Sequence, residues 1–126
     1  MKLIKKNQVE IRDFGKGLTL QILLDKIEGA INLDLGTVSI PPKSQTGMHS
    51  RKDFEEVIYM LSGTGQVITE DGLAYTLETG DCILIPQGVV HCHANNSDSS
   101  LEQLYIFAPQ ASAEIEESLR NLPILK

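Results

Sequence analysis

Short apolar segments, each ended by a turn, make up most of this chain. The run at residues 57–61 stops at a turn around Gly63, and the run at residues 82–85 stops at Pro86. Between them, Asp71-Gly72 separates two alternating segments, a pattern typical of a tight β-hairpin. Many short strands with glycine and proline turns predict a β-sandwich or a small β-barrel.

Further strands are expected on both sides of this region. Residues 31–40 alternate between apolar and polar, with a change of phase that predicts a bulge near Gly36, and Pro41-Pro42 ends the segment. Residues 91–94 and 104–107 have the length and composition of two more strands. The run at 57–61 is continuous, which favours a strand buried on both faces.

Helical periodicity is confined to the end of the chain. Ile115, Leu119 and Leu122 fall on one helical face, and Ser112 is a suitable N-cap. Acidic residues follow this cap, where they favour the positive end of the helix dipole. A short C-terminal helix is therefore expected beside the strands.

Size and charge limit the classes of function. A chain of 126 residues makes one domain that needs no disulfide, so Cys82 and Cys92 are expected to be small buried residues, with a disulfide as the alternative. The net charge is −6 and no basic block occurs, which argues against nucleic acid or an anionic membrane surface as a partner. The first residues contain no apolar run and no window is long enough to span a bilayer, so we expect a cytoplasmic protein.

Two spaced motifs give the most specific signal. The motif of the second half has five positions with fixed gaps of five, one, two and three residues between them. These positions are Gly80, Pro86, Gly88, His91 and Asn95. This spacing resembles the second motif of the cupin superfamily at every position. An upstream segment resembles the first cupin motif. It contains His49, Arg51, Glu56 and Gly63, separated by one, four and six residues.

The resemblance implies a fold and a site. The fold is an all-β double-stranded β-helix, or jelly-roll barrel, formed by residues 1–126 as a single domain with a short C-terminal helix. The motifs occupy about residues 43–63 and 80–95. Carried over position by position, they imply that His49, Glu56 and His91 bind a divalent transition metal inside the barrel.

Two positions depart from the family pattern. Arg51 stands where cupins have a second histidine, and Lys43 stands where a glycine is expected. Arginine has no lone pair to give to a metal, but its guanidinium suits a substrate carboxylate or phosphate, and we assign Arg51 this catalytic role. His93 shares a strand face with His91 and is the candidate fourth ligand, the alternative being a pocket or core histidine bonded to backbone.

Two imidazoles and a carboxylate are a sufficient ligand set for iron, manganese, zinc or nickel. The alternative is an internal ion pair between Glu56 and Arg51 in a metal-free barrel.

These residues support two main hypotheses of function. The first is a small metalloenzyme acting on an anionic or sugar-like substrate, of the dioxygenase, decarboxylase, lyase or isomerase type. The second is a non-catalytic module that binds or senses a small molecule, with Arg51 as its anchor. The apolar side chains of Val57, Tyr59 and Leu61 lie opposite Glu56 and predict a homodimer, because such a face needs covering.

Overall fold

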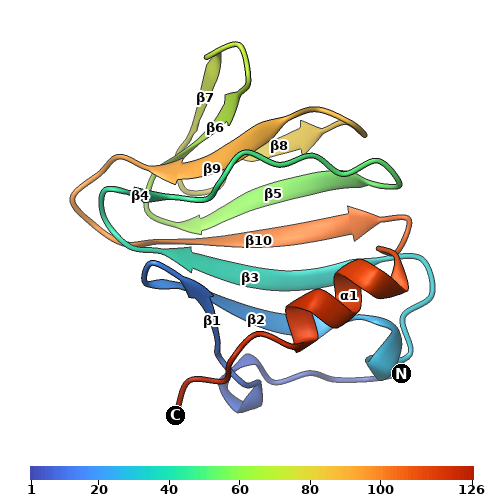
Figure 1. Ribbon diagram of the computed structural model, residues 1–126. Coiled ribbons are helices and arrows are strands. Elements are labelled where there is room, and N and C mark those ends of the chain that lie inside the picture. Colours follow the sequence, from blue (N-terminus) through green and yellow to red (C-terminus); the bar gives the residue numbers. More distant parts are fainter.

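The computed structural model describes residues 1–126 and contains two antiparallel β-sheets (Figure 1). The larger, six-stranded sheet has the order β1-β2-β3-β10-β5-β8, and the smaller, four-stranded sheet has the order β4-β9-β6-β7. The elements are η1 (Lys6–Gln8), β1 (Arg12–Gly15), β2 (Leu18–Leu24), η2 (Lys26–Glu28), β3 (Asp34–Ile40), β4 (Ser44–Gln45), β5 (Glu55–Ser62), β6 (Gly65–Thr69), β7 (Ala74–Leu77), β8 (Cys82–Ile85), β9 (His91–Asn95), β10 (Leu101–Ala108) and α1 (Ala113–Arg120).

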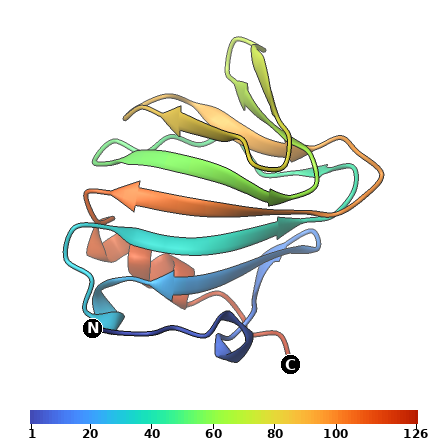
Figure 2. The same ribbon diagram turned by 180° about the vertical axis from the view of Figure 1, so that it is seen from behind.

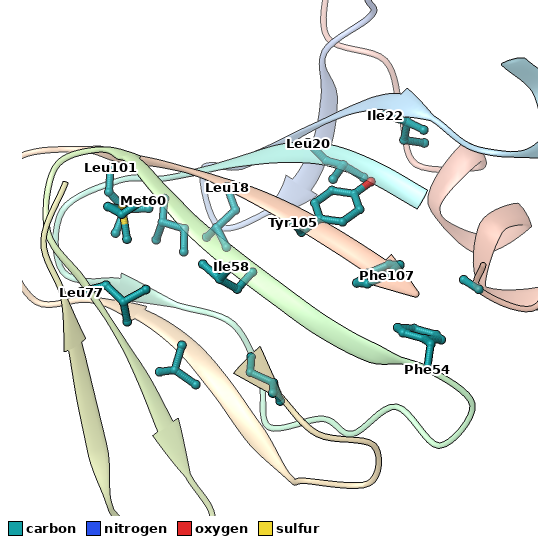
Figure 3. Close-up of a cluster of buried hydrophobic side chains, with 14 residues drawn as sticks. Leu18, Leu20, Ile22, Phe54, Ile58, Met60, Leu77, Leu101, Tyr105 and Phe107 are labelled. Atoms are coloured by element: carbon teal, nitrogen blue, oxygen red, sulfur yellow. The ribbon is translucent and has the colours of Figure 1, made fainter. Parts of the chain in front are cut away.

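The core lies on the inner face of the six-stranded sheet. Along β10, Leu101, Gln103, Tyr105 and Phe107 are buried, and the residues between them are half-buried. The period-two alternation places these four side chains on the same face. Figure 3 shows Tyr105 and Phe107 pointing toward the apolar side chains of β2 and β5, with Phe54 packed below them. The ring centroids of Phe54 and Phe107 lie 4.4 Å apart.

The structure confirms the predicted all-β class and most of the predicted strands. The hairpin of β6 and β7 turns at Gly72, which has a φ of 88°. Within the predicted segment 31–40, the strand begins only at Asp34, and Ile31 is exposed. The irregularity lies opposite Gly36 as expected, but the extra residue, Leu23, belongs to β2.

Three expectations about burial and extent were wrong. The strand β5 has one inward and one outward face, since Ile58 is buried whereas Tyr59 is 40% exposed. Cys82 is exposed, and both cysteines are free thiols. The last strand, β10, begins at Leu101 rather than Leu104.

The C-terminal helix α1 forms where the sequence predicts it. The Ser112 Oγ accepts a hydrogen bond from the Ile115 amide at 3.3 Å, and Ile115 and Leu119 pack against the core. The helix crosses in front of β2 and β3, on the inner side of the large sheet (Figure 1). Arg120 fixes its end through a bidentate ion pair with Asp25, at 2.8 and 2.9 Å. No helix of the structure combines the length and apolarity needed to cross a membrane.

Candidate metal centre

Three elements bring four ligand groups together. Glu56 comes from β5, His91 and His93 from β9, and His49 from the loop before β5, where it forms an isolated bridge with His91. The two backbone hydrogen bonds of this bridge, each 2.9 Å, hold His49 beside β9. One ligand atom from each of the four residues lies within 4.8 Å of the others. The structure thus assembles the four residues that the sequence singles out as metal ligands.

The spacing of the cluster fits a single ion. Zinc binds imidazole nitrogen and carboxylate oxygen at about 2.0–2.2 Å in a tetrahedral arrangement, so its donors lie about 3.4 Å from one another. In the protein, Nε2 of His91 lies 3.4 Å from Oε1 of Glu56, and Nε2 of His93 lies 3.8 Å from Oε2. Small side-chain rotations would bring all four donors to metal-binding distance.

Backbone carbonyls orient two of the imidazoles. Nδ1 of His49 donates to the Gly47 carbonyl oxygen at 2.8 Å, and Nδ1 of His91 donates to that of Val89 at 2.9 Å. A carbonyl only accepts, so these bonds place the proton on Nδ1 and leave Nε2 with a free lone pair.

The buried polar atoms of the cluster lack partners within the protein. Oε1 of Glu56, Nε2 of His91 and Nδ1 of His93 are inaccessible to solvent and make no hydrogen bond. Buried polar groups normally have a partner, and leaving one unsatisfied costs about 1–3 kcal/mol. Three such atoms in one cluster are the observation that best fits a bound cation.

The electrostatics also favour a ligand set. Burial lowers the pKa of His93 to about 4, and burial also lowers the pKa of His49, so both imidazoles are neutral at pH 7. Burial alone would raise the pKa of Glu56, but the three histidines together lower it. Burial opposes the charged form of His91, whereas Glu56 and the Val89 carbonyl raise its pKa. Metals bind neutral imidazoles and ionised carboxylates, so His49, His93 and Glu56 are in the required forms, whereas His91 must release the proton that Glu56 stabilises.

Arg51 lines the same cavity but does not pair with Glu56. It forms none of the salt bridges of the structure, and its buried Nε has no hydrogen-bond partner. Its carbonyl oxygen accepts a 2.7 Å hydrogen bond from the Gly88 amide, which ties the His49 loop to the turn before β9. The structure therefore contains no Glu56–Arg51 ion pair, and Arg51 lines the cavity without a bonded carboxylate.

The cavity has a volume of about 290 Å³ and contains a polar residue that the sequence reasoning missed. Gln103 is buried on β10 and lines the cavity. Extending the alternation of Tyr105 and Phe107 backward along the chain would have placed it on the inner face. Met60, also on an inner face, belongs to the core and not to the cavity wall.

The fold and the cluster together define a small double-sheet barrel protein with a buried three-histidine, one-carboxylate site. The family model of the cupin domain matches residues 36–107, which is more than half of the chain and includes all four ligand candidates. The chain belongs to the cupin family.

Similar proteins agree with this assignment. An uncharacterized protein of Methanocaldococcus jannaschii is 28% identical over 122 residues, which cover 94% of this chain and 97% of that protein. The polyketide cyclase RemF of Streptomyces resistomycificus has a similar structure, with a TM-score of 0.78 and 22% identity over 88% of this chain and 81% of its own. An RmlC-like cupin of Shewanella frigidimarina gives a TM-score of 0.75 and 23% identity, over 91% and 96% of the two chains.

A sugar phosphate isomerase of Silicibacter pomeroyi gives a TM-score of 0.72 with 16% identity, over 85% of this chain and 75% of its own. At these identities, the structural likeness establishes the shared fold. The function must be argued from the site.

Proposed function

We propose that this protein is a metal-dependent enzyme that acts on a small anionic substrate. His49, Glu56, His91 and His93 hold a divalent transition metal, iron, manganese, zinc or nickel, and Arg51 binds the anionic group of the substrate beside it. The observation that carries the proposal is the convergence of four donor residues, three of which have a buried polar atom without a hydrogen-bond partner. When bound, such a metal supplies Lewis-acid chemistry or activates water or dioxygen.

Other groups of the chain bind the substrate and orient the metal ligands. Arg51 lines the cavity and offers two parallel N–H donors to a carboxylate or phosphate. The carbonyls of Gly47 and Val89 hold two imidazoles in one orientation. The similar structures include a polyketide cyclase and a sugar phosphate isomerase, which supports an enzyme without choosing its reaction.

A non-catalytic binding module is the second candidate, and one observation favours it. Outside the four metal ligands, the polar cavity wall consists of Thr46, Arg51, Gln103 and Tyr105. Arginine stays protonated, and burial raises the pKa of Tyr105 above its ordinary value, so neither serves as a general base at neutral pH. Without a metal, the same cavity would bind an anion and do no chemistry.

Elemental analysis of the protein as purified, never exposed to chelator, tests the proposal. We expect close to one equivalent of a transition metal per chain, and a loss of at least tenfold in His49→Ala, His91→Ala and Glu56→Ala. Glu55→Ala is the matched control, because Glu55 is the adjacent residue of the same strand and is exposed. This variant should keep the metal of the unmodified protein.

Two results would contradict the metal site. One is less than a tenth of an equivalent of any transition metal in the unmodified protein, with none gained on addition. The other is equal metal content in the Glu56→Ala and Glu55→Ala variants, which would place the ion elsewhere. In either case the binding-module function would become the first candidate.

A further inference from the structure

The cavity runs across the strands of the large sheet and changes character along its length. Glu56 lies on β5 at one end, and Leu20 lies on β2 at the other, with β10 and β3 between these two strands. Neighbouring strands lie about 4.8 Å apart, so three such steps separate the two ends by roughly 14 Å. The ligand cluster therefore occupies one end of an elongated cavity.

The end remote from the cluster is apolar. The side chains that line it are Phe14, Leu20, Val38 and Leu119, whereas Phe107 pairs directly with Glu56 and lies beside the cluster. Leu119 belongs to α1, which packs in front of β2 and β3 (Figure 1). We call Phe14, Leu20, Val38 and Leu119 the apolar arm of the cavity. Apolar walls bind apolar ligand surface, because its removal from water is favourable by about 25 cal/mol per Å².

Only two polar groups border the apolar arm. The backbone register places Gln103 of β10 directly between Val38 and Met60, and it places Tyr105 between Gly36 and Ile58. Neither the Gln103 amide nor the Tyr105 hydroxyl has a hydrogen-bond partner in the protein. Thr46 also lines the cavity, but its hydroxyl already accepts a bond from the His93 amide at 3.0 Å.

The number of polar partners decides the class of ligand. A sugar carries a hydroxyl on most of its carbons, and each hydroxyl buried without a partner costs about 1–3 kcal/mol. The apolar arm offers partners for one or two such groups. In contrast, a chain or ring of carbons would make apolar contacts with the wall. One polar substituent on it could form a hydrogen bond with Gln103.

We infer that the ligand of this site is an amphipathic acid, with its anionic group on Arg51 beside the metal and an aromatic or aliphatic body along the apolar arm. This inference rests on the proposed function for the anion site at Arg51. A cavity of about 290 Å³ lies at the small end of the range for ligand pockets, about 300–1,000 Å³. The acid is therefore a small one, rather than a long fatty acid.

Calorimetric titration with two sets of acids tests the inference. The first set is 3-phenylpropanoate, indole-3-acetate and octanoate, and the second is gluconate, galacturonate and malate. The protein is used as purified, with its metal content measured on the same sample. At least one acid of the first set should bind ten times more tightly than any acid of the second, and its neutral amide should bind at least ten times more weakly.

Variants locate the binding. Arg51→Gln should weaken binding of the preferred acid at least tenfold, whereas Lys52→Ala, which removes the exposed neighbouring charge, should not change it. Val38→Phe should fill the apolar arm and weaken the same acid at least tenfold. Circular dichroism establishes that each variant is folded, and Leu119→Phe, on the opposite wall, is the second test of the arm if Val38→Phe does not fold.

The outcomes separate this inference from the proposed function. Tighter binding of gluconate or galacturonate, or no binding of any acid at 10 mM, would overturn the amphipathic ligand even where one equivalent of metal is present. Preferred binding of a first-set acid by protein that carries no metal and takes up none would support the ligand class and contradict the metal-dependent enzyme.

Discussion

At the scale of single residues, Gly36 leaves the space that Tyr105 occupies at the cavity wall. A Cβ at this position would lie 2.5 Å from the Gln21 carbonyl oxygen and 2.5 Å from Cε2 of Tyr105. Such distances force either the strand or the ring to move. The phase change that the sequence shows near Gly36 thus marks a close approach of side chain and backbone as well as an irregular register.

Gly36→Ala is expected to lower the free energy of unfolding by about 2–3 kcal/mol, because overpacking of a well-filled core costs about this much. Urea unfolding followed by circular dichroism measures the change. Gly47→Ala is the control: a Cβ there meets nothing within 4 Å. Its effect should stay within about 0.5 kcal/mol. Equal stability of the two variants would mean that the position of the Tyr105 ring does not require the absence of a side chain at Gly36.

The motif departures are also residue-scale features, and the structure explains one of them. Lys43 stands where the family pattern has glycine, and its φ of 56° lies in the left-handed region that favours glycine. Its Nζ donates to the Asn96 carbonyl oxygen at 2.6 Å, a contact that glycine would not make. The backbone of the motif is therefore kept although the residue is changed. Arg51, by contrast, changes the chemistry of the site.

At the scale of elements, α1 is fixed to the large sheet partly by two carboxyl groups. Asp34 at the start of β3 accepts a 2.8 Å hydrogen bond from the Ala111 amide through Oδ2. Its Oδ1 and Oε2 of Glu116 on α1 are buried without a partner. Burial, and then the neighbouring Glu116 carboxyl, raise the pKa of Asp34 to about 7. Two adjacent buried carboxylates would repel each other, so the folded state is favoured when one of the two groups holds a proton.

This pair makes stability depend on pH. Between the ordinary Asp value of 3.8 and about 7, the folded protein keeps a proton that the unfolded chain has released. Raising the pH through this window therefore lowers the free energy of unfolding, because the unfolded state binds fewer protons. The stabilisation is fully present below about pH 4 and is lost above about pH 7.

Asp34→Asn should remove most of this dependence, because an amide keeps the acceptor for Ala111 and supplies a permanent N–H toward Glu116. We expect the variant to be more stable than the unmodified protein by about 2 kcal/mol at pH 8, after allowance for screening by solvent. Urea midpoints at pH 5 and pH 8 measure it. Glu114→Gln, on the exposed side of α1, is the control. Unchanged pH dependence in Asp34→Asn would contradict the shared proton.

The elements that local sequence determines were predictable, and those that depend on distant contacts were not. The hairpin at Gly72 and the cap at Ser112 follow from a few neighbouring residues. The strands β1 and β2 were not predicted. The strand β1 pairs with β2, and β2 pairs with β3, which follows in the sequence after η2. Gln103 was missed because the beginning of β10 is set by its pairing with β3 and not by its own composition.

The same distinction applies to the candidate site. The period of two placed His91 and His93 on one face of a strand, and the structure places both in the cluster. His49, however, lies outside any regular strand and reaches the cluster through a single bridge to His91. The position of His49 depends on loop conformation, and so does the absence of an ion pair between Arg51 and Glu56. Motif spacing pointed to these residues, whereas only the fold shows their distances.

At the scale of the whole molecule, one face of the large sheet is uncovered. Figure 2 shows this sheet from the side opposite α1, with β3, β10, β5 and β8 facing the viewer. The register aligns apolar outward side chains across these four strands: Leu35, Ile106, Val57 and Leu84 form one row. Tyr59 lies beside this row and is 40% exposed, and Leu84 is 56% exposed. A continuous apolar row of this kind marks an interaction surface.

We propose that a second copy of the chain covers this row. A two-fold axis would bring the same row of each chain together, so one apolar surface serves as both partners, the commonest arrangement in soluble oligomers. Light scattering at micromolar concentration should give twice the chain mass of 13.9 kDa. The double variant Tyr59→Lys and Leu84→Lys should be monomeric, because burying a lysine without a partner is costly.

Leu73→Lys is the matched control for the dimer, since Leu73 is 53% exposed but precedes β7 in the smaller sheet. This variant should keep the mass of the unmodified protein. The metal content of the Tyr59 and Leu84 variant should also be unchanged, because both side chains point away from the cavity. A monomeric mass for the unmodified protein would refute the homodimer. Loss of metal together with the dimer would instead show that the outer face and the cluster depend on each other, because the barrel then needs its partner to hold Glu56 of β5 in place.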